Sequence, residues 1–218
     1  MALADVRPPL RPGEPAPDFT LPAAHGDGLV SLADYRGRSP VLLALFRGLY
    51  CPFCRRDLVR LGATAQKLDG LGVRTLAIFA TAAERARLYF RIRPPRVPIG
   101  ADPDLATHRA YGVPQTAMTP EIWQAAESSA VGVARELGLP VPASGALEAI
   151  SRHDGFVATE SDDADAERHQ AQFTGQFLVD RDGIVRWANI ECARDGLAGL
   201  GKMPTNEEWL AAARALSG

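Results

Sequence analysis

Two apolar runs in the chain predict the centre of a β-sheet. Residues 41–46 carry no charge and are bounded by Pro40 and Arg47, which is typical of a buried strand. Residues 73–79 form a second run of mostly apolar residues. Because a helical pattern lies between the two runs, a single crossover joins them, and we predict a parallel pair of strands.

The segment between these strands predicts a helix with a marked start and end. Pro52 fits the first helical position, where its missing N–H costs no hydrogen bond. Leu58, Leu61 and Leu68 recur at helical spacing and supply a buried face. Gly70 follows as the signal that ends the helix.

Shorter elements are predicted on both sides of this unit. A small hairpin of 19–21 and 29–31 comes first, and a helix from 82 to about 91 follows the second strand, with Thr81 as its cap and Leu88 and Tyr89 packed inward. A short edge strand at 97–100 and a helix through 102–111 come next. The chain ends with a hairpin of 173–180 and 184–190 and a last helix opened by a Thr205–Glu208 capping box. Residues 1–17 contain five prolines and are expected to be extended, with a poorly ordered start.

The stretch 112–172 is too long for an unstructured loop in a compact domain, so we predict helices within it. In order, it has helical spacing at 120–137, a break rich in Pro and Gly at 138–145, another helical turn at 146–151 and an acidic, solvated helix within 156–172. These acids with His153 and His169 are an alternative set of metal ligands, although ordered metal spacing is absent. The 218 residues suit one domain with an insertion at about 112–172 better than two domains.

Two cysteines lie at the start of the first predicted helix and carry the candidate chemistry. Cys51 is at or near the N-cap, where unpaired N–H groups and the helix dipole favour thiolate over thiol. Arg47, Arg55 and Arg56 add positive charge nearby. Cys54 lies one turn along the same helix and can reach Cys51 to form a disulfide.

Two other interpretations of this cysteine pair stay open. The pair is either half of a zinc site or an inert remnant of a redox fold, but a zinc site needs two more ligands at suitable spacing. Only Cys192 remains, and the four histidines are scattered. A chain with few cysteines and one CxxC pair is typical of a reducing, cytoplasmic environment, where such pairs are catalytic or redox-sensing.

Several motifs in a fixed order resemble the opening of the alkyl hydroperoxide reductase/thiol-specific antioxidant (AhpC/TSA) superfamily. These are segments 15–21 and 30–38, followed by 46–54, which is most similar to the peroxiredoxin-like branch that carries CxxC. The resemblance covers 15–111 and resumes at 173–216. It implies an α/β, thioredoxin-like fold of peroxiredoxin type, with a central mixed sheet flanked by helices, an N-terminal hairpin and, in this chain, a helical insertion.

The chain departs from the family pattern at three positions. The family carries a Thr or Ser that holds the peroxide where this chain has Gly48, and a proline where it has Ala44. The family's second arginine falls at Thr174. Arg47, four residues before Cys51, is the available substitute.

The resemblance places Thr174 beside the reactive thiolate. Because hairpin strands run back along each other, residues 189–192 lie at the same end of the sheet as Thr174, which brings Cys192 and Glu191 near the site. Cys192 is either a further redox residue or a packing residue. The candidate catalytic residues are Cys51, Cys54 and Arg47, and the candidate substrate-binding residues are Tyr50 and Thr174.

Three functions remain in competition. The leading hypothesis is a thiol peroxidase in which Cys51 reduces hydrogen peroxide or an organic hydroperoxide, Cys54 resolves the product as a disulfide, and a thioredoxin- or glutathione-type thiol reduces that disulfide. The alternative is a thiol–disulfide oxidoreductase that acts on protein disulfides, which the missing hydroxyl and arginine favour. A non-enzymatic binding protein on a redox fold is the third. None requires a metal, flavin or haem cofactor, and a homodimer is the assembly we consider.

Charge and composition exclude some partners. The net charge of −2 gives no basic footprint for nucleic acid or an anionic membrane surface. No apolar stretch approaches the roughly 20 residues that span a bilayer. Residues 1–11 lack the apolar core of a signal peptide, so we expect a protein without a secretory leader.

Overall fold

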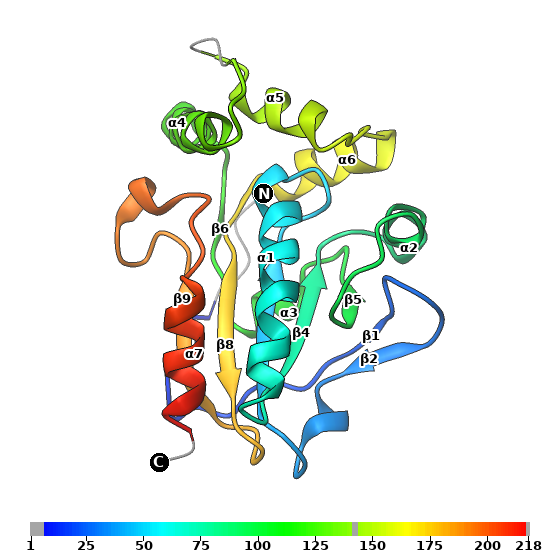
Figure 1. Cartoon of the computed structure of the whole chain (residues 1–218), viewed down its shortest axis with the longest axis vertical. Helices are drawn as coiled ribbons and strands as arrows, with labels where there is room; N and C mark the ends of the chain where they lie inside the picture. The colour runs from blue at the N-terminus through cyan, green and yellow to red at the C-terminus, as the bar shows by residue number, and fades with distance from the viewer. Residues whose placement is uncertain (1–6, 141–143, 217–218) are drawn as a thin grey trace.

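A five-stranded mixed sheet forms the centre of the protein in the computed structural model, which describes residues 7–140 and 144–216 (Figure 1). The strand order is β5-β4-β3-β8-β9. Strand β3 (Val41–Phe46) runs parallel to β4 (Arg74–Phe79), as predicted from the single crossover, and antiparallel to β8 (Gly175–Val179). Strand β5 (Ile99–Ala101) lies at one edge and β9 (Val185–Ile190) at the other.

Strand β3 is buried on both faces, which explains its uninterrupted apolar sequence. Leu42, Ala44 and Phe46 point into one core, where they meet helix α1 (Pro52–Asp69), helix α2 (Ala83–Arg91) and helix α7 (Asn206–Arg214). Leu43 and Leu45 point into a second core on the opposite face. The carboxyl end of β3 is therefore held rigidly at the point where α1 begins.

Most of the predicted elements are confirmed. Strands β1 (Thr20–Pro22) and β2 (Leu29–Ser31) form the N-terminal hairpin, and helix α3 (Ala106–Ala110) follows β5. Two short 3-10 turns lie at Ala33–Tyr35 and Gly196–Gly199. The β8–β9 hairpin and the Thr205–Glu208 capping box of α7 are also as predicted. Among the described helices, none combines the length and apolar composition that crossing a membrane requires.

Three helices occupy the long segment that follows α3. They are α4 (Pro120–Glu136), α5 (Ala146–His153) and α6 (Glu160–His169), and they gather beyond the N-terminal end of α1 (Figure 1). Two short strands, β6 (Gln115–Thr116) and β7 (Ala171–Gln172), pair antiparallel and bring the two ends of the segment together. We propose that this segment is an insertion in a single domain; we call its three helices the cap.

The acidic helix of the cap is not simply solvated, as its composition suggested. Asp162 is 1% exposed and accepts two hydrogen bonds from Arg85 of α2, at 2.8 and 2.7 Å. Asp165 and His169 are buried as well. Asp162 also completes a capping box with Thr159, so one face of α6 is buried against the rest of the molecule.

The prediction for α2 was wrong in two respects. Thr81 does not cap the helix, because its hydroxyl accepts a hydrogen bond from the Leu49 amide at 3.0 Å and α2 begins two residues later. Leu88 is 51% exposed, whereas Ala86 and Phe90 are the buried residues of this helix. Tyr89 is partly buried against the same core, so that part of the prediction is confirmed.

Two other segments differ from the prediction. Regular helix after β5 begins only at Ala106, because Asp102 turns back to accept the amides of Ala106 and Thr107 and Leu105 has a positive φ of 58°. The poorly ordered start expected for the chain falls largely on residues 1–6, which lie outside the described residues. Leu10, further along, is buried and donates its amide to the carbonyl of Tyr111.

Candidate active site

Cys51 caps the N-terminus of α1, as the sequence predicted. It has an extended backbone conformation, and its sulfur accepts the Cys54 amide at 3.4 Å, while Pro52 occupies the first helical position. Only 5% of Cys51 is exposed, and Cys54 is more deeply buried. The two sulfurs therefore lie in the first turn of one helix, with Cys51 at its positive end.

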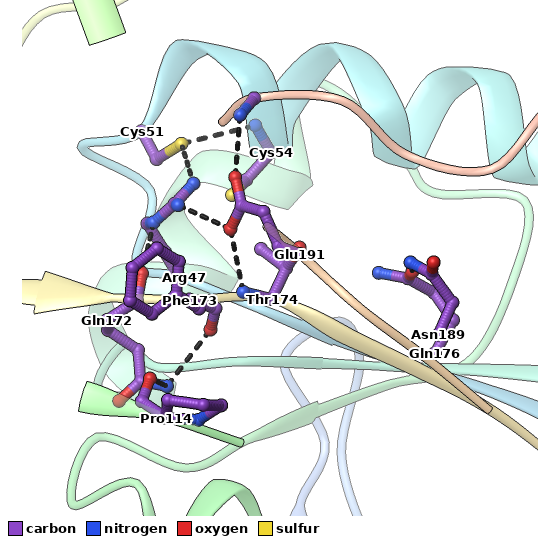
Figure 2. A network of polar contacts seen from close by, with 11 residues as sticks. Arg47, Cys51, Cys54, Pro114, Gln172, Phe173, Thr174, Gln176, Asn189 and Glu191 are labelled. Carbon is purple, nitrogen blue, oxygen red and sulfur yellow. Dashed lines mark hydrogen bonds and ion pairs between the residues drawn. The ribbon is translucent and has the colours of Figure 1, made fainter. Parts of the chain in front are cut away.

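Arg47 lies between the Cys51 sulfur and a buried carboxylate (Figure 2). One guanidinium nitrogen, Nη1, lies 3.6 Å from Cys51 Sγ, and Nη2 lies 2.5 Å from an oxygen of Glu191. The third nitrogen, Nε, donates to the carbonyl of Gln172 in β7. Each nitrogen position of the guanidinium thus has a partner, which fixes its orientation toward the sulfur.

Glu191 is the residue that holds Arg47 in place. Its carboxylate also accepts the amide of Thr174 at 2.9 Å and the amide of Gly201 at 2.6 Å (Figure 2). A buried carboxylate needs such donors because burial otherwise disfavours its charge. The hairpin geometry placed Glu191 near the site, but its pairing with Arg47 across the sheet carried no local signal.

The environment shifts the pKa values of the two thiols in opposite directions. Burial raises the pKa of Cys51, but the hydrogen bond from Cys54 and the charge of Arg47 outweigh it and lower that pKa to about 6. Burial, the Cys51 contact and the Cys51 charge all raise the pKa of Cys54 well above its usual range. At neutral pH, Cys51 is therefore the thiolate and Cys54 keeps its proton.

A cavity of about 600 Å³ adjoins Cys51 and is lined in part by residues of the cap. Arg47, Tyr50 and Cys51 line its floor, and the remaining lining is largely apolar. A substrate-binding role for Tyr50 stays a prediction. The Tyr50 hydroxyl has no hydrogen-bond partner among the described residues, and burial raises its pKa.

Other predicted site residues lie elsewhere. Arg55 donates to the Leu49 carbonyl and to Ser151 of α5, and Arg56 pairs with Asp154, so both attach the cap. Arg55 also interacts with the charge of Cys51, which confirms that it adds positive charge near the thiol, whereas this role of Arg56 stays a prediction. Thr174 offers its backbone amide to Glu191 and is not among the described residues that line the cavity. A substrate-binding role for Thr174 stays a prediction.

Cys192 follows Glu191 but does not face the cavity. It has a positive φ of 66°, and burial and the neighbouring Glu191 raise its pKa to about 11. A redox role for this thiol stays a prediction. Within the described part of the chain, no group of three or more His, Cys, Asp or Glu side chains is arranged to hold a metal ion.

Comparison with known sequences gives one family. A model of the AhpC/TSA family matches residues 12–188. Two curated relatives from two strains of Mycobacterium tuberculosis, both named as peroxiredoxins, are each 31% identical to the chain over 103 residues. The match covers 47% of the chain and 64% of each relative, so the chain spans less than two thirds of the length of these curated relatives.

Solved structures with the same fold include peroxiredoxins and a thiol:disulfide interchange protein. The reduced 2-Cys peroxiredoxin of Plasmodium vivax aligns with a TM-score of 0.61 and 15% identity, over 96% of this chain and 83% of its own. A thiol:disulfide interchange protein of Chlorobium tepidum aligns with a TM-score of 0.53 and 20% identity, over 94% and 99%. These likenesses confirm the predicted thioredoxin-like, peroxiredoxin-type fold.

Proposed function

Since the chain belongs to the AhpC/TSA family, we propose that it is a thiol-dependent redox enzyme that reduces hydroperoxides through Cys51. One observation carries the proposal. The Cys51 sulfur lies at a helix start, 3.6 Å from a guanidinium that a buried carboxylate holds in place, and it faces a cavity. This arrangement supplies both a thiolate at neutral pH and a fixed positive charge where a peroxide would react.

The proposed reaction consumes one hydroperoxide and two thiols. The Cys51 thiolate attacks the terminal peroxide oxygen, so that an S–O bond forms, the O–O bond breaks and the leaving oxygen takes up a proton as an alcohol or water. Cys54 then attacks the sulfenic acid of Cys51, which forms the disulfide and releases water. An external thiol returns two electrons by disulfide exchange.

The surrounding residues have distinct roles in this scheme. Arg47 touches the reacting sulfur and stabilises the negative charge that moves onto the leaving oxygen, which makes it a catalytic residue. Glu191 acts through Arg47 and is a positioning residue. Burial of the Arg47–Glu191 pair fixes the guanidinium before substrate arrives, so little reorganisation is needed during the reaction.

A second candidate is a thiol–disulfide oxidoreductase that acts on protein disulfides. It is favoured by the packing at Gly48, the position of the hydroxyl in the family pattern. A Cβ there would lie 2.6 Å from the Tyr50 ring and 2.9 Å from the Ala80 carbonyl, so a Thr or Ser does not fit without moving Tyr50. The CxxC pair suits disulfide exchange equally well.

The external thiol in the proposal is of the thioredoxin or glutathione type, acting in the cytoplasm. The proposed assembly is a homodimer, which sedimentation equilibrium tests directly. Neither alters the chemistry at Cys51.

A side-by-side assay decides between the two enzyme functions. Wild-type protein and Cys51→Ser are mixed with hydrogen peroxide, with an organic hydroperoxide and with a protein disulfide, and Cys51 oxidation or disulfide loss is followed by stopped flow. The peroxidase proposal expects oxidation of Cys51 far faster than that of a free thiol. A protein no faster with peroxide than a free thiol, but active on the disulfide, establishes the second candidate.

A further inference from the structure

Cys54 carries a proton that has no direct route into the cavity. Burial, the contact with Cys51 and the charge of Cys51 hold the pKa of Cys54 well above its usual range, so this thiol is protonated at neutral pH. Cys54 is 1% exposed and is not among the described residues that line the cavity. Since the thiolate is the form that attacks, Cys54 needs a proton acceptor within the protein.

Asp57 lies one helical turn beyond Cys54 on α1. Residues three positions apart on a helix have Cβ atoms about 5–6 Å from each other. Side chains of a helix also lean toward its N-terminus, so the carboxylate of Asp57 reaches back over the turn that contains Cys54. A proton can cross this spacing directly or through one water molecule.

One oxygen of the Asp57 carboxylate is free to accept a proton. Its Oδ1 accepts a hydrogen bond from Arg60 at 3.1 Å, whereas Oδ2 has no hydrogen-bond partner among the described residues. The side chain of Asp57 is 18% exposed, so a proton that it takes up can pass on to solvent. Glu191, the other carboxylate near Cys54, uses both of its oxygens to accept hydrogen bonds.

The groups around Asp57 bring its pKa into the neutral range. Burial raises this pKa, Arg60 lowers it, and the charges of Cys51 and of Glu191 on β9 raise it further, to about 7. Helix α7 contributes the uncharged Trp209, whose ring lies against Arg60. A carboxylate with such a pKa is a stronger base than an ordinary one and is still partly ionised at pH 7, which suits it to accept a proton there.

We propose that Asp57 takes the proton of Cys54 when Cys54 attacks Cys51, and returns it when the disulfide is reduced. The inference rests on the role of Cys54 in the proposed function. In the attack, an electron pair of Cys54 forms the S–S bond and the S–O bond of the Cys51 sulfenic acid breaks. The leaving hydroxide takes up a proton as water, and Asp57 passes the Cys54 proton to solvent.

An aromatic disulfide separates the attack by Cys51 from the attack by Cys54. Dithiodipyridine reacts with the Cys51 thiolate, which forms a mixed disulfide and releases one thiopyridone. Cys54 then attacks that mixed disulfide, gives its proton to Asp57 and releases a second thiopyridone. Stopped-flow absorbance records the two releases as two phases without any peroxide. The Cys192→Ser variant serves as the background, so that only these two thiols react.

Asp57→Asn should slow the second phase by at least about tenfold at pH 8, a cautious value below the roughly 10²–10⁴-fold typical of a general base. The first phase should not change, because Cys51 is already ionised at that pH. A charge effect alone has the opposite sign: removal of a negative group near Cys54 lowers the pKa of that thiol and speeds its attack.

The pH profile gives a second measurement of the same role. In the parent protein the rate of the second phase should rise through about pH 7, as Asp57 loses its own proton, and this rise should be absent from Asp57→Asn. Arg60→Met removes the cation that lowers the Asp57 pKa, so it should move the rise to higher pH.

The matched control is Asp69→Asn. Asp69 lies at the far end of the same helix and also pairs with an arginine, Arg74, at 3.2 Å. Its loss should change neither phase. Urea denaturation of each variant shows whether the fold is kept.

The outcomes separate this inference from the proposed function. A second phase that Asp57→Asn leaves unchanged or speeds, or an equal slowing of both phases, overturns the role of Asp57 even if peroxide reduction is fast. Release of fewer than two thiopyridones also overturns it, because Cys54 then does not attack Cys51. If peroxide reacts no faster than with a free thiol but Asp57→Asn slows only the second phase, the peroxidase fails and the proton acceptor stands.

Discussion

Replacing Arg47 by Ala should slow peroxide reduction strongly while changing disulfide exchange little at pH 7. Arg47 lies 3.6 Å from the Cys51 sulfur, and an opposite charge at such a distance typically lowers a pKa by about 1–3. The Cys51 pKa is about 6 with Arg47 present. Its loss therefore moves that pKa back toward the ordinary value of a cysteine.

The size of the effect follows from the fraction of thiolate. With a pKa of about 6, about nine tenths of Cys51 is ionised at pH 7, and a rise of about 2 leaves about one tenth, a loss of roughly tenfold. A more basic thiolate is also more nucleophilic, with a Brønsted slope of about 0.4–0.5, so the rate constant of the thiolate itself rises roughly eightfold. These two changes nearly cancel at pH 7, so disulfide exchange should change little.

Peroxide reduction has an additional loss that does not cancel. The leaving oxygen gains negative charge in the transition state, and removal of one fixed donor there typically costs about 10²–10³-fold in rate. We expect Arg47→Ala to lower peroxide-driven oxidation of Cys51 by at least about tenfold, a cautious value below that range. The loss should persist at pH 9, where both proteins are mostly ionised.

Folding has to be controlled in this experiment, because Arg47→Ala leaves the buried Glu191 carboxylate without its cation. Breaking a buried pair on one side typically costs about 3–5 kcal/mol. The double variant Arg47→Met/Glu191→Gln removes both charges and should recover most of that stability in urea denaturation. It should keep the peroxide defect, which separates the chemical role of Arg47 from its structural role.

The assay is stopped-flow oxidation of Cys51 by hydrogen peroxide between pH 6 and pH 9, with reduction of a small disulfide measured in parallel. Iodoacetamide alkylation against pH gives the Cys51 pKa of each variant. Equal losses in the two reactions would mean that Arg47 only tunes the thiol. An unchanged Cys51 pKa in the variant would refute the electrostatic argument.

Three further predictions follow from the same structure. Iodoacetamide should label Cys51 before Cys54 and Cys192, with a half-maximal rate near pH 6, and peptide mass spectrometry that finds another cysteine labelled first contradicts the assignment of the nucleophile. Mild oxidation should link Cys51 to Cys54 within one chain, and a dominant Cys51–Cys192 bridge in non-reduced peptide maps would make Cys192 the resolving residue instead. Arg85→Ala should lower the free energy of unfolding in urea by about 3–5 kcal/mol, because it leaves the buried Asp162 unpaired, and a loss below about 1 kcal/mol would show that the pair contributes little.

Local sequence signals predicted the centre of the fold and the position of Cys51 at a helix start. The short uncharged run of β3 indicated a buried strand, and Pro52 indicated the helix start that places Cys51 at the N-cap. Each of these features depends on residues within one turn or one strand. A local pattern of residues was therefore enough to predict the buried strand and the helix start.

The remaining features depend on contacts between residues far apart in the chain. Glu191 is 144 positions from Arg47, and only the register of β8 and β9 against β3 brings them together. The cavity depends on how the cap docks, and buried ion pairs such as Arg85–Asp162 determine that. Charged residues suggest solvated surfaces when their partners are unknown, which is why α6 was predicted to be exposed.

The two-residue ladder of β6 and β7 has a consequence for how such a protein can diversify. Gln115 pairs with Gln172 and Thr116 with Ala171, so everything from 117 to 170 leaves and re-enters the fold at one narrow neck. Because the ends of that segment already meet, loops of very different length can close the same gap at little extra entropic cost. Arg47 contacts the neck through the Gln172 carbonyl. A segment of different length can therefore close the same gap without moving the backbone that holds Arg47.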